Sequence, residues 1–237
     1  MLRLRTRPFS CVLVVGWVLA VASVLMAEDA PAPKKPDAEP PAKTAWKMLC
    51  DGKSLTDWKV TNFGGEGAVK AEDGAIVMQQ GADLTGINWA GAALPVVNYE
   101  VALDAEKIGG NDFFCGLVFP VGEAHCSFVV GGWGGGVVGL SAVDGQYADG
   151  NETTSIGSFD KKHWYQIRLR VSEKYIQAWI DNKRVFSLNT TGKKLTVHPA
   201  VEALKPFGVS CYATVAAVKN IRVRELTKEE SLEVPKE

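Results

Sequence analysis

The chain has 237 residues, a formal net charge of -1 and 46% hydrophobic residues. A near-neutral chain lacks the basic face that nucleic-acid binding needs, so we expect no nucleic-acid partner. The hydrophobic content is sufficient for one full core.

The N-terminus has the pattern of an export signal. Arg3, Arg5 and Arg7 precede an apolar run from Val12 to Ala27. A membrane-spanning helix needs about 20 apolar residues, so the shorter run predicts a signal peptide over residues 1–27. An uncleaved membrane anchor is the alternative, and it would be the chain's one connection to a membrane. We therefore expect a secreted protein, or one in the periplasm or cell envelope.

Composition predicts three further segments. Residues 28–43 are rich in Pro, Ala and Lys, and such a stretch is expected to be an extended linker because it cannot bury a core. Residues 44–226 form the predicted folded domain. Residues 227–237 are charged and are expected to be a frayed tail.

The predicted domain contains many short strands. Residues 164–171 alternate between apolar and polar side chains, which is typical of a half-buried strand. Residues 113–119 and 126–130 are almost continuously apolar, as expected of central strands covered on both faces. Further strands are predicted over residues 69–71, 75–78, 99–104, 137–143, 175–180, 207–212 and 216–226. No segment has a clear helical period, apart from room for one short turn within 195–204, so we predict a single all-β domain.

Both ends of this domain resemble a known family. The segments Leu49–Lys59 and Val218–Leu226 resemble the opening and closing motifs of the DUF1080 family, also called the 3-keto-disaccharide hydrolase or 3-keto-glucoside lyase/hydratase domain. Tyr175–Leu188 resembles a hairpin of the family, with Asp181-Asn182 at its turn. The resemblance implies a concanavalin A-like or laminin G-like jelly-roll sandwich of two antiparallel sheets. It also implies acid/base cleavage or hydration of 3-keto-glucosides.

The middle of the chain departs from the family pattern. Gly109-Gly110-Asn111 is similar to the family's entry into a strand, but the segment 112–119 has no Arg where the family commonly has one. The segment 126–131 likewise contains no Glu or Gln. The resemblance therefore transfers the fold and carries over no catalytic residue.

Three residues are candidates for catalysis of the implied reaction. Elimination at a 3-keto sugar needs a base for the acidified C2 proton and an acid for the leaving group, and a His with a carboxylate suits this work. His125 and Glu123 flank one predicted turn, and Asp112 is expected on the same rim. The alternative is the ordinary polarity of a turn at the edge of a sheet.

Three other residues are candidates for substrate binding. Trp133 lies in a glycine-rich run, where it could form an exposed platform for a sugar ring, or it could pack in the core beside a glycine-lined bulge. Asn111 begins the predicted groove strand. Arg170 lies on one face of an alternating strand, where it could hold a hydroxyl-rich ligand or belong to a solvated face.

A polar loop is a candidate calcium site. Asp144, Asp149, Asn151 and Glu152 supply oxygen atoms within a short stretch, and Ca²⁺ prefers several such ligands on a flexible loop. The spacing does not match an EF-hand, and a solvated polar loop is the alternative.

Four of the five cysteines follow the predicted signal peptide. Export makes disulfides possible, and the favoured pairing joins Cys115 to Cys126 and Cys50 to Cys211. Buried reduced thiols are the alternative. The cysteine and histidine spacing does not match a zinc site.

Two functions remain open. The first is a secreted enzyme that acts on keto-glycosides, for which His125 and carboxylates should converge in one groove. The second is a non-catalytic carbohydrate- or protein-binding module on a stalk, for which an aromatic platform such as Trp133 should lack a paired acid and base. A sandwich fold hosts both.

Overall fold

The computed structural model describes residues 44–235, which all belong to one compact unit. The predicted signal peptide, the alternative anchor and the predicted linker lie outside the described residues. Among residues 44–235, no helix is long and apolar enough to cross a membrane.

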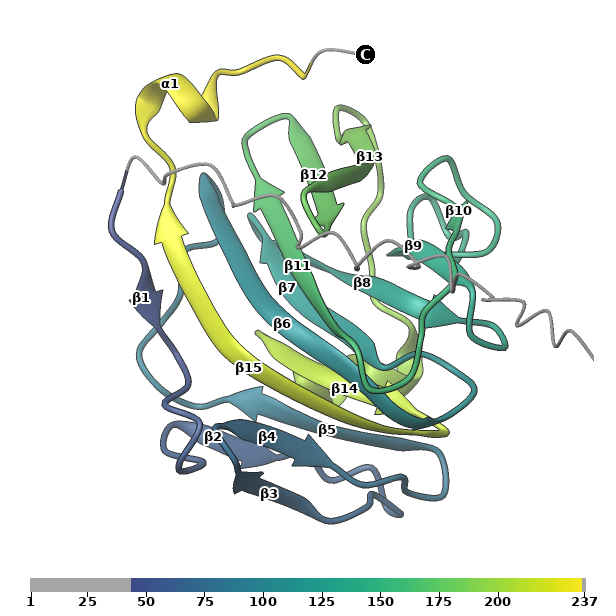
Figure 1. Ribbon diagram of the computed structural model, residues 1–237. Coiled ribbons are helices and arrows are strands. Elements are labelled where there is room, and N and C mark those ends of the chain that lie inside the picture. Colours follow the sequence, from purple (N-terminus) through teal and green to yellow (C-terminus); the bar gives the residue numbers. More distant parts are fainter. Residues whose placement is uncertain (1–43, 236–237) are drawn as a thin grey trace, which may run out of the picture. The chain divides into compact units, whose positions relative to one another are not determined.

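Two antiparallel sheets form the domain (Figure 1), which confirms the predicted all-β sandwich. Sheet A has eight strands in the order β13-β12-β11-β6-β15-β4-β3, with β1 also paired to β15. Its strands are β1 (Lys47–Met48), β3 (Val69–Glu72), β4 (Ala75–Met78), β6 (Tyr99–Gly110), β11 (Trp164–Val171), β12 (Tyr175–Ile180), β13 (Lys183–Asn189) and β15 (Thr214–Glu225).

Sheet B has seven strands in the order β10-β9-β8-β7-β14-β5-β2. Its strands are β2 (Trp58–Val60), β5 (Leu84–Trp89), β7 (Cys115–Val121), β8 (Ala124–Gly132), β9 (Val137–Ser141), β10 (Ser155–Ile156) and β14 (Gly208–Tyr212). Many neighbours in both sheets are far apart in sequence, so most of the pairing depends on long-range contacts.

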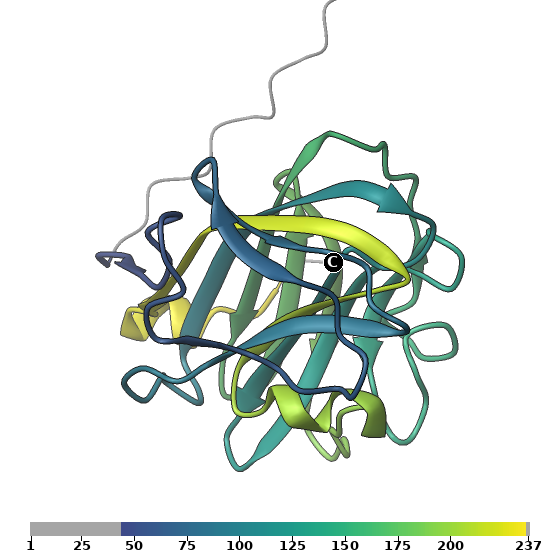
Figure 2. The same ribbon diagram turned by 90° about the horizontal axis from the view of Figure 1, so that it is seen from below.

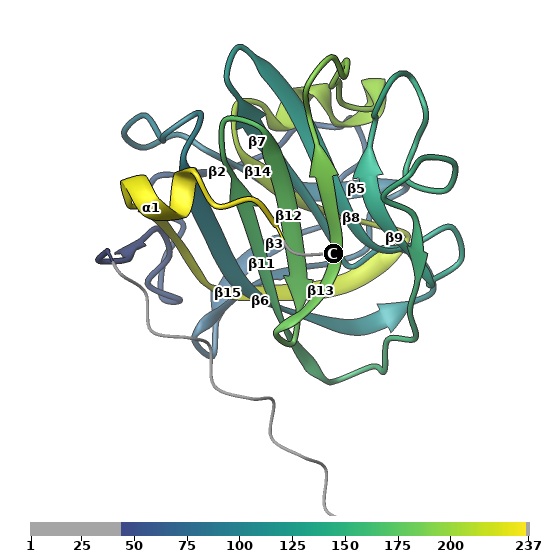
Figure 3. The same cartoon turned by 90° about the horizontal axis from the view of Figure 1, so that it is seen from above.

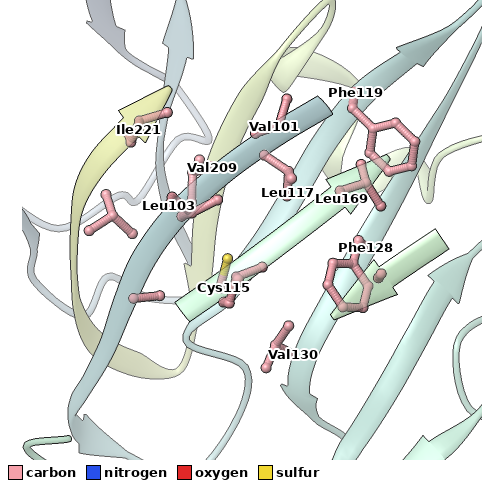
Figure 4. Packing of buried hydrophobic residues seen from close by; sticks show 14 of the residues in the cluster. Val101, Leu103, Cys115, Leu117, Phe119, Phe128, Val130, Leu169, Val209 and Ile221 are labelled. Carbon is pink, nitrogen blue, oxygen red and sulfur yellow. The ribbon is translucent and has the colours of Figure 1, made fainter. Parts of the chain in front are cut away.

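Side chains from the two sheets meet in one hydrophobic core. Figure 4 shows Leu103, Leu169 and Ile221 of sheet A between the same two layers as Leu117 and Phe128 of sheet B. Because side chains alternate along a strand, every second residue of these strands must lie on an outer face. On sheet B, the residues that alternate with the core residues therefore form its outer face.

The hairpins follow the turn signals of the sequence. Asp181 and Asn182 connect β12 to β13 with φ values of 48° and 63°, the left-handed pair that a type I′ turn needs. Trp58 is buried and donates its indole N–H to the Leu49 carbonyl over 2.8 Å. The motif at the start of the domain is thus a core element.

A short 3₁₀ helix covers part of the outer face of sheet B. This helix, η1 (Pro199–Leu204), lies within the segment predicted to hold one turn, and it is the yellow-green coil near the bottom of Figure 2. Its Val201 and Leu204 form a small cluster with Leu84 and Val118. This covering explains why the strand around Val118 is apolar on both faces.

The C-terminal segment differs from the expected frayed tail. Helix α1 (Lys228–Ser231) follows β15 and lies beside sheet A (Figure 3). A capping box joins Thr227 to Glu230, and the buried Glu230 carboxylate pairs with Arg224 at 2.9 Å. The Thr-x-x-Glu spacing that predicts such a cap is present in the sequence.

Candidate functional site

A groove of about 630 Å³ lies on the outer face of sheet B. This volume is within the range of small-molecule sites, roughly 300 to 1,000 Å³. Small residues that alternate with core positions of β7, β8, β9 and β14 form the floor: Gly116, Ser127, Ser141 and Ser210.

The small floor residues leave room for the aromatic walls. A Cβ atom on Gly116 would lie 2.9 Å from Cε2 of Phe113 and 3.1 Å from Oγ of Ser210. A larger residue would therefore displace Phe113. Ser127 donates its hydroxyl to the Ser141 carbonyl over 2.5 Å, so the hydroxyl oxygen keeps a lone pair with which to accept a hydrogen bond from a ligand.

Aromatic rings line the groove at its open side. Trp133 is 48% exposed and Tyr212 is 38% exposed. The Tyr212 ring stacks on Phe113 with centroids 5.9 Å apart and an angle of 26° between the planes. Trp133 is thus an exposed side chain in the groove, as the platform interpretation expects, and is not packed in the core.

Two apolar clusters support the walls. One joins η1 to the sheet through Val201, Leu84 and Val118, with Phe63 and Phe113 packed against it. The other consists of Val129, Val137 and Ala148, and Phe113 packs against it as well. Phe113 therefore links both clusters and gives the groove a fixed wall.

The acidic and imidazole side chains in the groove lining are Asp83, Asp112 and His198. His198 accepts the backbone N–H of Ala200 at Nδ1 over 3.1 Å, so a neutral His198 carries its proton on Nε2. The His198 ring lies 4.7 Å from the Tyr147 ring. His198 is thus placed to donate a hydrogen bond.

The Asp112 carboxylate is bonded to backbone groups. Its Oδ1 accepts the N–H of Phe113 over 2.8 Å, and its Oδ2 accepts the N–H of Gly134 over 2.9 Å. Of the three predicted catalytic residues, Asp112 lies in the groove together with Trp133.

The other two predicted catalytic residues lie elsewhere. Glu123 is exposed in the turn between β7 and β8, and His125 is half-buried opposite Pro120; neither lines the groove. Burial lowers the pKa of His125; Lys205 lowers it further and Glu202 raises it. The convergence of His125 with carboxylates in one groove is therefore not observed, and their catalytic roles stay predictions.

The remaining predicted binding residues do not share the groove. Asn111 is exposed beside Asp112 and does not line it. Arg170 is on β11 of sheet A, where its guanidinium lies 3.6 Å from Glu100 and 3.3 Å from Glu233. The sandwich thus separates Arg170 from Trp133, and Arg170 belongs to an ion-pair network.

The predicted calcium loop is held together by its own contacts. The amide nitrogen of Asn151 donates to the carbonyls of Leu140 and Tyr147, each over 2.7 Å. Lys193 forms ion pairs with Asp144 and Glu152, and Asp149 is exposed. Among residues 44–235, no group of three or more His, Cys, Asp or Glu side chains could hold a metal ion. Calcium binding at this loop stays a prediction.

The four cysteines of the described chain are free and buried. The strand register is incompatible with the predicted Cys115–Cys126 bond, because Cys115 lies opposite Val130 while Cys126 lies opposite Phe119. The two thiols are therefore several residues apart along the β7–β8 pair.

Sequence reasoning missed Asp83, His198 and Tyr212. Asp83 and Tyr212 are at strand ends, and His198 precedes η1, so no local pattern connects them. The sequence offered one signal for these three residues: Tyr212 is an aromatic residue at the end of an apolar strand.

A family comparison identifies the domain. The model of the 3-keto-alpha-glucoside-1,2-lyase-like domain matches residues 45–224. The chain belongs to this family. It is therefore a carbohydrate-related β-sandwich domain, as the motifs at its two ends predicted. No curated protein matches the chain.

Solved structures support the fold of this lyase-like domain. The Crh5 transglycosylase in complex with NAG is similar with a TM-score of 0.54 and 12% identity, covering 80% of this chain and 86% of that chain. A Bacillus subtilis protein with a galectin-like fold has a TM-score of 0.52 at 12% identity, covering 76% and 98%. The Emp46p carbohydrate recognition domain has a TM-score of 0.51 at 12% identity, covering 76% and 94%. These matches show the jelly-roll fold alone.

Proposed function

We propose that the groove on sheet B binds the sugar ring of a glycoside. The observation that carries this proposal is the exposed Trp133 beside Tyr212, above a floor of Gly and Ser residues. Sugar rings present an apolar C–H face and a rim of hydroxyls, and aromatic side chains supply a large rigid surface for the apolar face.

The polar groups of the groove suit the hydroxyl rim. The Asp83 carboxylate accepts hydrogen bonds, and the Nε2–H of His198 donates one. A few polar groups in a mostly apolar pocket fix the orientation of a ligand. This arrangement supports binding of a neutral sugar ring between the aromatic walls.

The test of this proposal is calorimetric titration of the full chain with methyl α-glucoside and with its 3-keto derivative. We expect binding of at least one of them, weakened at least about tenfold, or 1.4 kcal/mol, in Trp133→Ala. Gln166→Ala, an exposed change on sheet A, is the matched control. Equal affinity of wild type and Trp133→Ala would contradict the groove as the binding site.

We propose turnover of a 3-keto-glucoside as a second candidate function, because the family match favours it. In a 1,2-elimination, a base removes the C2 proton beside the ketone. The C2–H electron pair then forms the C1=C2 bond while the C1–O bond breaks and the leaving oxygen takes up a proton. Asp83 is the better candidate base, because backbone N–H groups already bond both oxygens of Asp112. The Nε2–H of His198 is the candidate donor to the leaving oxygen.

Mass spectrometry of the products separates the two functions. A lyase releases methanol and an unsaturated keto-sugar from the 3-keto glucoside, and Asp83→Asn should reduce this rate by at least about a hundredfold. Binding of the 3-keto glucoside without product, in wild type as in Asp83→Asn, would reject turnover and retain the binding proposal.

A further inference from the structure

Trp133 is held in a backbone conformation that side chains other than glycine rarely adopt. Its φ is 49°, and the following Gly134 and Gly135 have φ values of 85° and 108°. A non-glycine residue in this left-handed region is destabilised, because its Cβ atom comes too close to the backbone. Neighbouring contacts must therefore hold the turn that presents the indole to the groove.

The contact that reaches this turn comes from Asp112. Its Oδ2 accepts the N–H of Gly134, the residue directly after Trp133, over 2.9 Å. A carboxylate that accepts a backbone N–H makes a stronger hydrogen bond than a neutral acceptor. The carboxylate is thus bonded to the peptide group that joins Trp133 to Gly134.

Asp112 is itself fixed to the body of the sandwich. The Oγ1 of Thr214 accepts the Asp112 N–H over 3.2 Å and donates to the Asp112 carbonyl over 3.0 Å. Thr214 is fully buried at the start of β15. A chain of contacts therefore runs from sheet A through Thr214 and Asp112 to the Trp133 turn.

We propose that Asp112 is a positioning residue that presents Trp133 to the ligand. This inference rests on the proposed sugar-binding function. It gives Asp112 a role through its backbone contacts, in place of the proton transfer that its predicted catalytic role requires.

A double-mutant cycle on the titration with the methyl glucosides tests the inference. Trp133→Ala and Asp112→Ala should each lower the affinity about tenfold, and the double variant should lose no more than either single variant, because both remove the same contact. Asp83→Ala combined with Trp133→Ala is the matched control, and its effects should add. Asp112→Asn keeps an acceptor oxygen for Gly134 and should retain most of the affinity.

The outcomes distinguish the inference from the function it rests on. Unchanged affinity in Trp133→Ala would reject the sugar platform itself. Lost affinity in Trp133→Ala with unchanged affinity in Asp112→Ala, or additive losses in the double variant, would reject positioning by Asp112. Where Asp112→Ala does not fold, Thr214→Val replaces it in the same cycle, since it removes the contact that anchors Asp112.

Two cysteines, Cys115 and Cys211, lie beneath the groove floor. The β7–β14 register pairs Ser210 with Gly116 and Val209 with Leu117, and its continuation by one residue would bring Cys211 opposite Cys115. Both thiols belong to the core, and Cys115 is shown there in Figure 4. The neighbouring Cys211 contributes to the raised pKa of Cys115, after burial as the larger cause. The two sulfurs are therefore cross-strand neighbours.

We infer that Cys115 and Cys211 form a disulfide when the chain folds in the presence of a disulfide oxidant. The two thiols lose two protons and two electrons to form the S–S bond, and the oxidant disulfide is reduced to two thiols. Both thiols are fully buried in the folded domain. Thiolates are the reactive species, so the bond should form before the core closes.

The experiment is oxidative refolding of the reduced full chain with oxidised and reduced glutathione. Iodoacetamide then blocks free thiols under denaturing conditions, and peptide mass spectrometry maps the products. We expect a cross-linked peptide pair containing Cys115 and Cys211, with Cys50 and Cys126 alkylated. Cys211→Ala should leave Cys115 alkylated, and Cys126→Ala is the control that should leave the cross-link unchanged. Alkylation of all four cysteines, or a cross-link from Cys115 to Cys126, would overturn the inference.

Discussion

The two outer faces of the sandwich use their polar residues differently. On sheet A, the buried Glu100 carboxylate lies 2.5 Å from Arg168 and is also paired with Arg224. Arg168 in turn lies over the Trp179 ring, 3.8 Å from its centroid. On sheet B, Trp133 is exposed in a groove and is held there against its backbone preference.

The polar side chains of sheet A therefore stabilise the fold, whereas those of the groove on sheet B are available to a ligand. Charges that neutralise one another and fasten α1 to sheet A stabilise the fold. Exposed aromatic and polar side chains around a hollow leave interactions for a ligand. Changes on sheet A should therefore alter stability, while changes in the groove should alter binding.

Glu100→Gln should give the largest effect on stability. Removing one partner of a buried ion pair leaves uncompensated charge and costs about 3 to 5 kcal/mol, here at Arg168, while Arg224 keeps its pairing with Glu230. Urea unfolding measures this loss. Glu233→Gln is the control, because an exposed ion pair contributes about 0 to 1 kcal/mol. A decrease of less than about 1 kcal/mol in the free energy of unfolding of Glu100→Gln would contradict a stabilising role for this ion-pair network.

Acid should also destabilise the domain through sheet A. The hydrogen bond from Arg224 lowers the pKa of Glu230 from 4.5 to about 2, with further contributions from Thr227 and Arg170, against a smaller opposing effect of burial. The unfolded chain therefore takes up this proton before the folded chain does, and stability falls as the pH decreases from 4.5 towards 2.

Glu230→Gln measures this contribution. Its free energy of unfolding should be lower than wild type at pH 7, and it should fall less steeply between pH 4.5 and pH 2, in a series of urea titrations. Parallel curves for the two proteins over this range would show that Glu230 is not the group responsible.

Trp133→Gly on sheet B should weaken sugar binding without lowering stability. Glycine adopts the left-handed conformation without the steric cost of a side chain, so the free energy of unfolding should stay constant or rise by up to about 1 kcal/mol. Affinity for the methyl glucosides should fall at least about tenfold. A clear loss of stability would indicate that Trp133 is a structural residue.

Calcium should have the smallest effect. Lys193 already pairs with Asp144 and Glu152, so a cation must displace its ammonium group. We expect millimolar calcium to change Tm by less than about 1 °C in differential scanning fluorimetry, a shift well below that of a stabilising change of about 1 kcal/mol. A larger rise that EDTA reverses would support the predicted calcium site.

Local patterns predicted the strands well. The alternation from Trp164 to Val171 coincides with β11, and the Asp181-Asn182 turn lies where the sequence indicates it. Strand β5 was missed because Gly86 and Asn88 interrupt its apolar pattern. Alternation also shows that Arg168 and Arg170 share a face, but it does not say which sheet that strand joins.

The site depended on long-range pairing. Asp83, Asp112 and Tyr212 meet because β5, β7 and β14 are neighbours in sheet B, although they are distant in sequence. The sequence alone indicated Trp133 and Asp112 as separate candidate site residues. The hydrogen bond between Asp112 and the Trp133 turn could be found only in the folded structure. His125 and Glu123 are close in sequence, and yet neither of them lines the groove.

One calorimetric titration series with the methyl 3-keto-α-glucoside tests which face of the sandwich binds the sugar. It compares wild type, Trp133→Ala on sheet B and Arg170→Lys on sheet A. The groove account predicts that wild type and Arg170→Lys bind equally and that Trp133→Ala binds at least about tenfold more weakly. Binding that survives in Trp133→Ala and is lost in Arg170→Lys would place the ligand on sheet A and contradict the account.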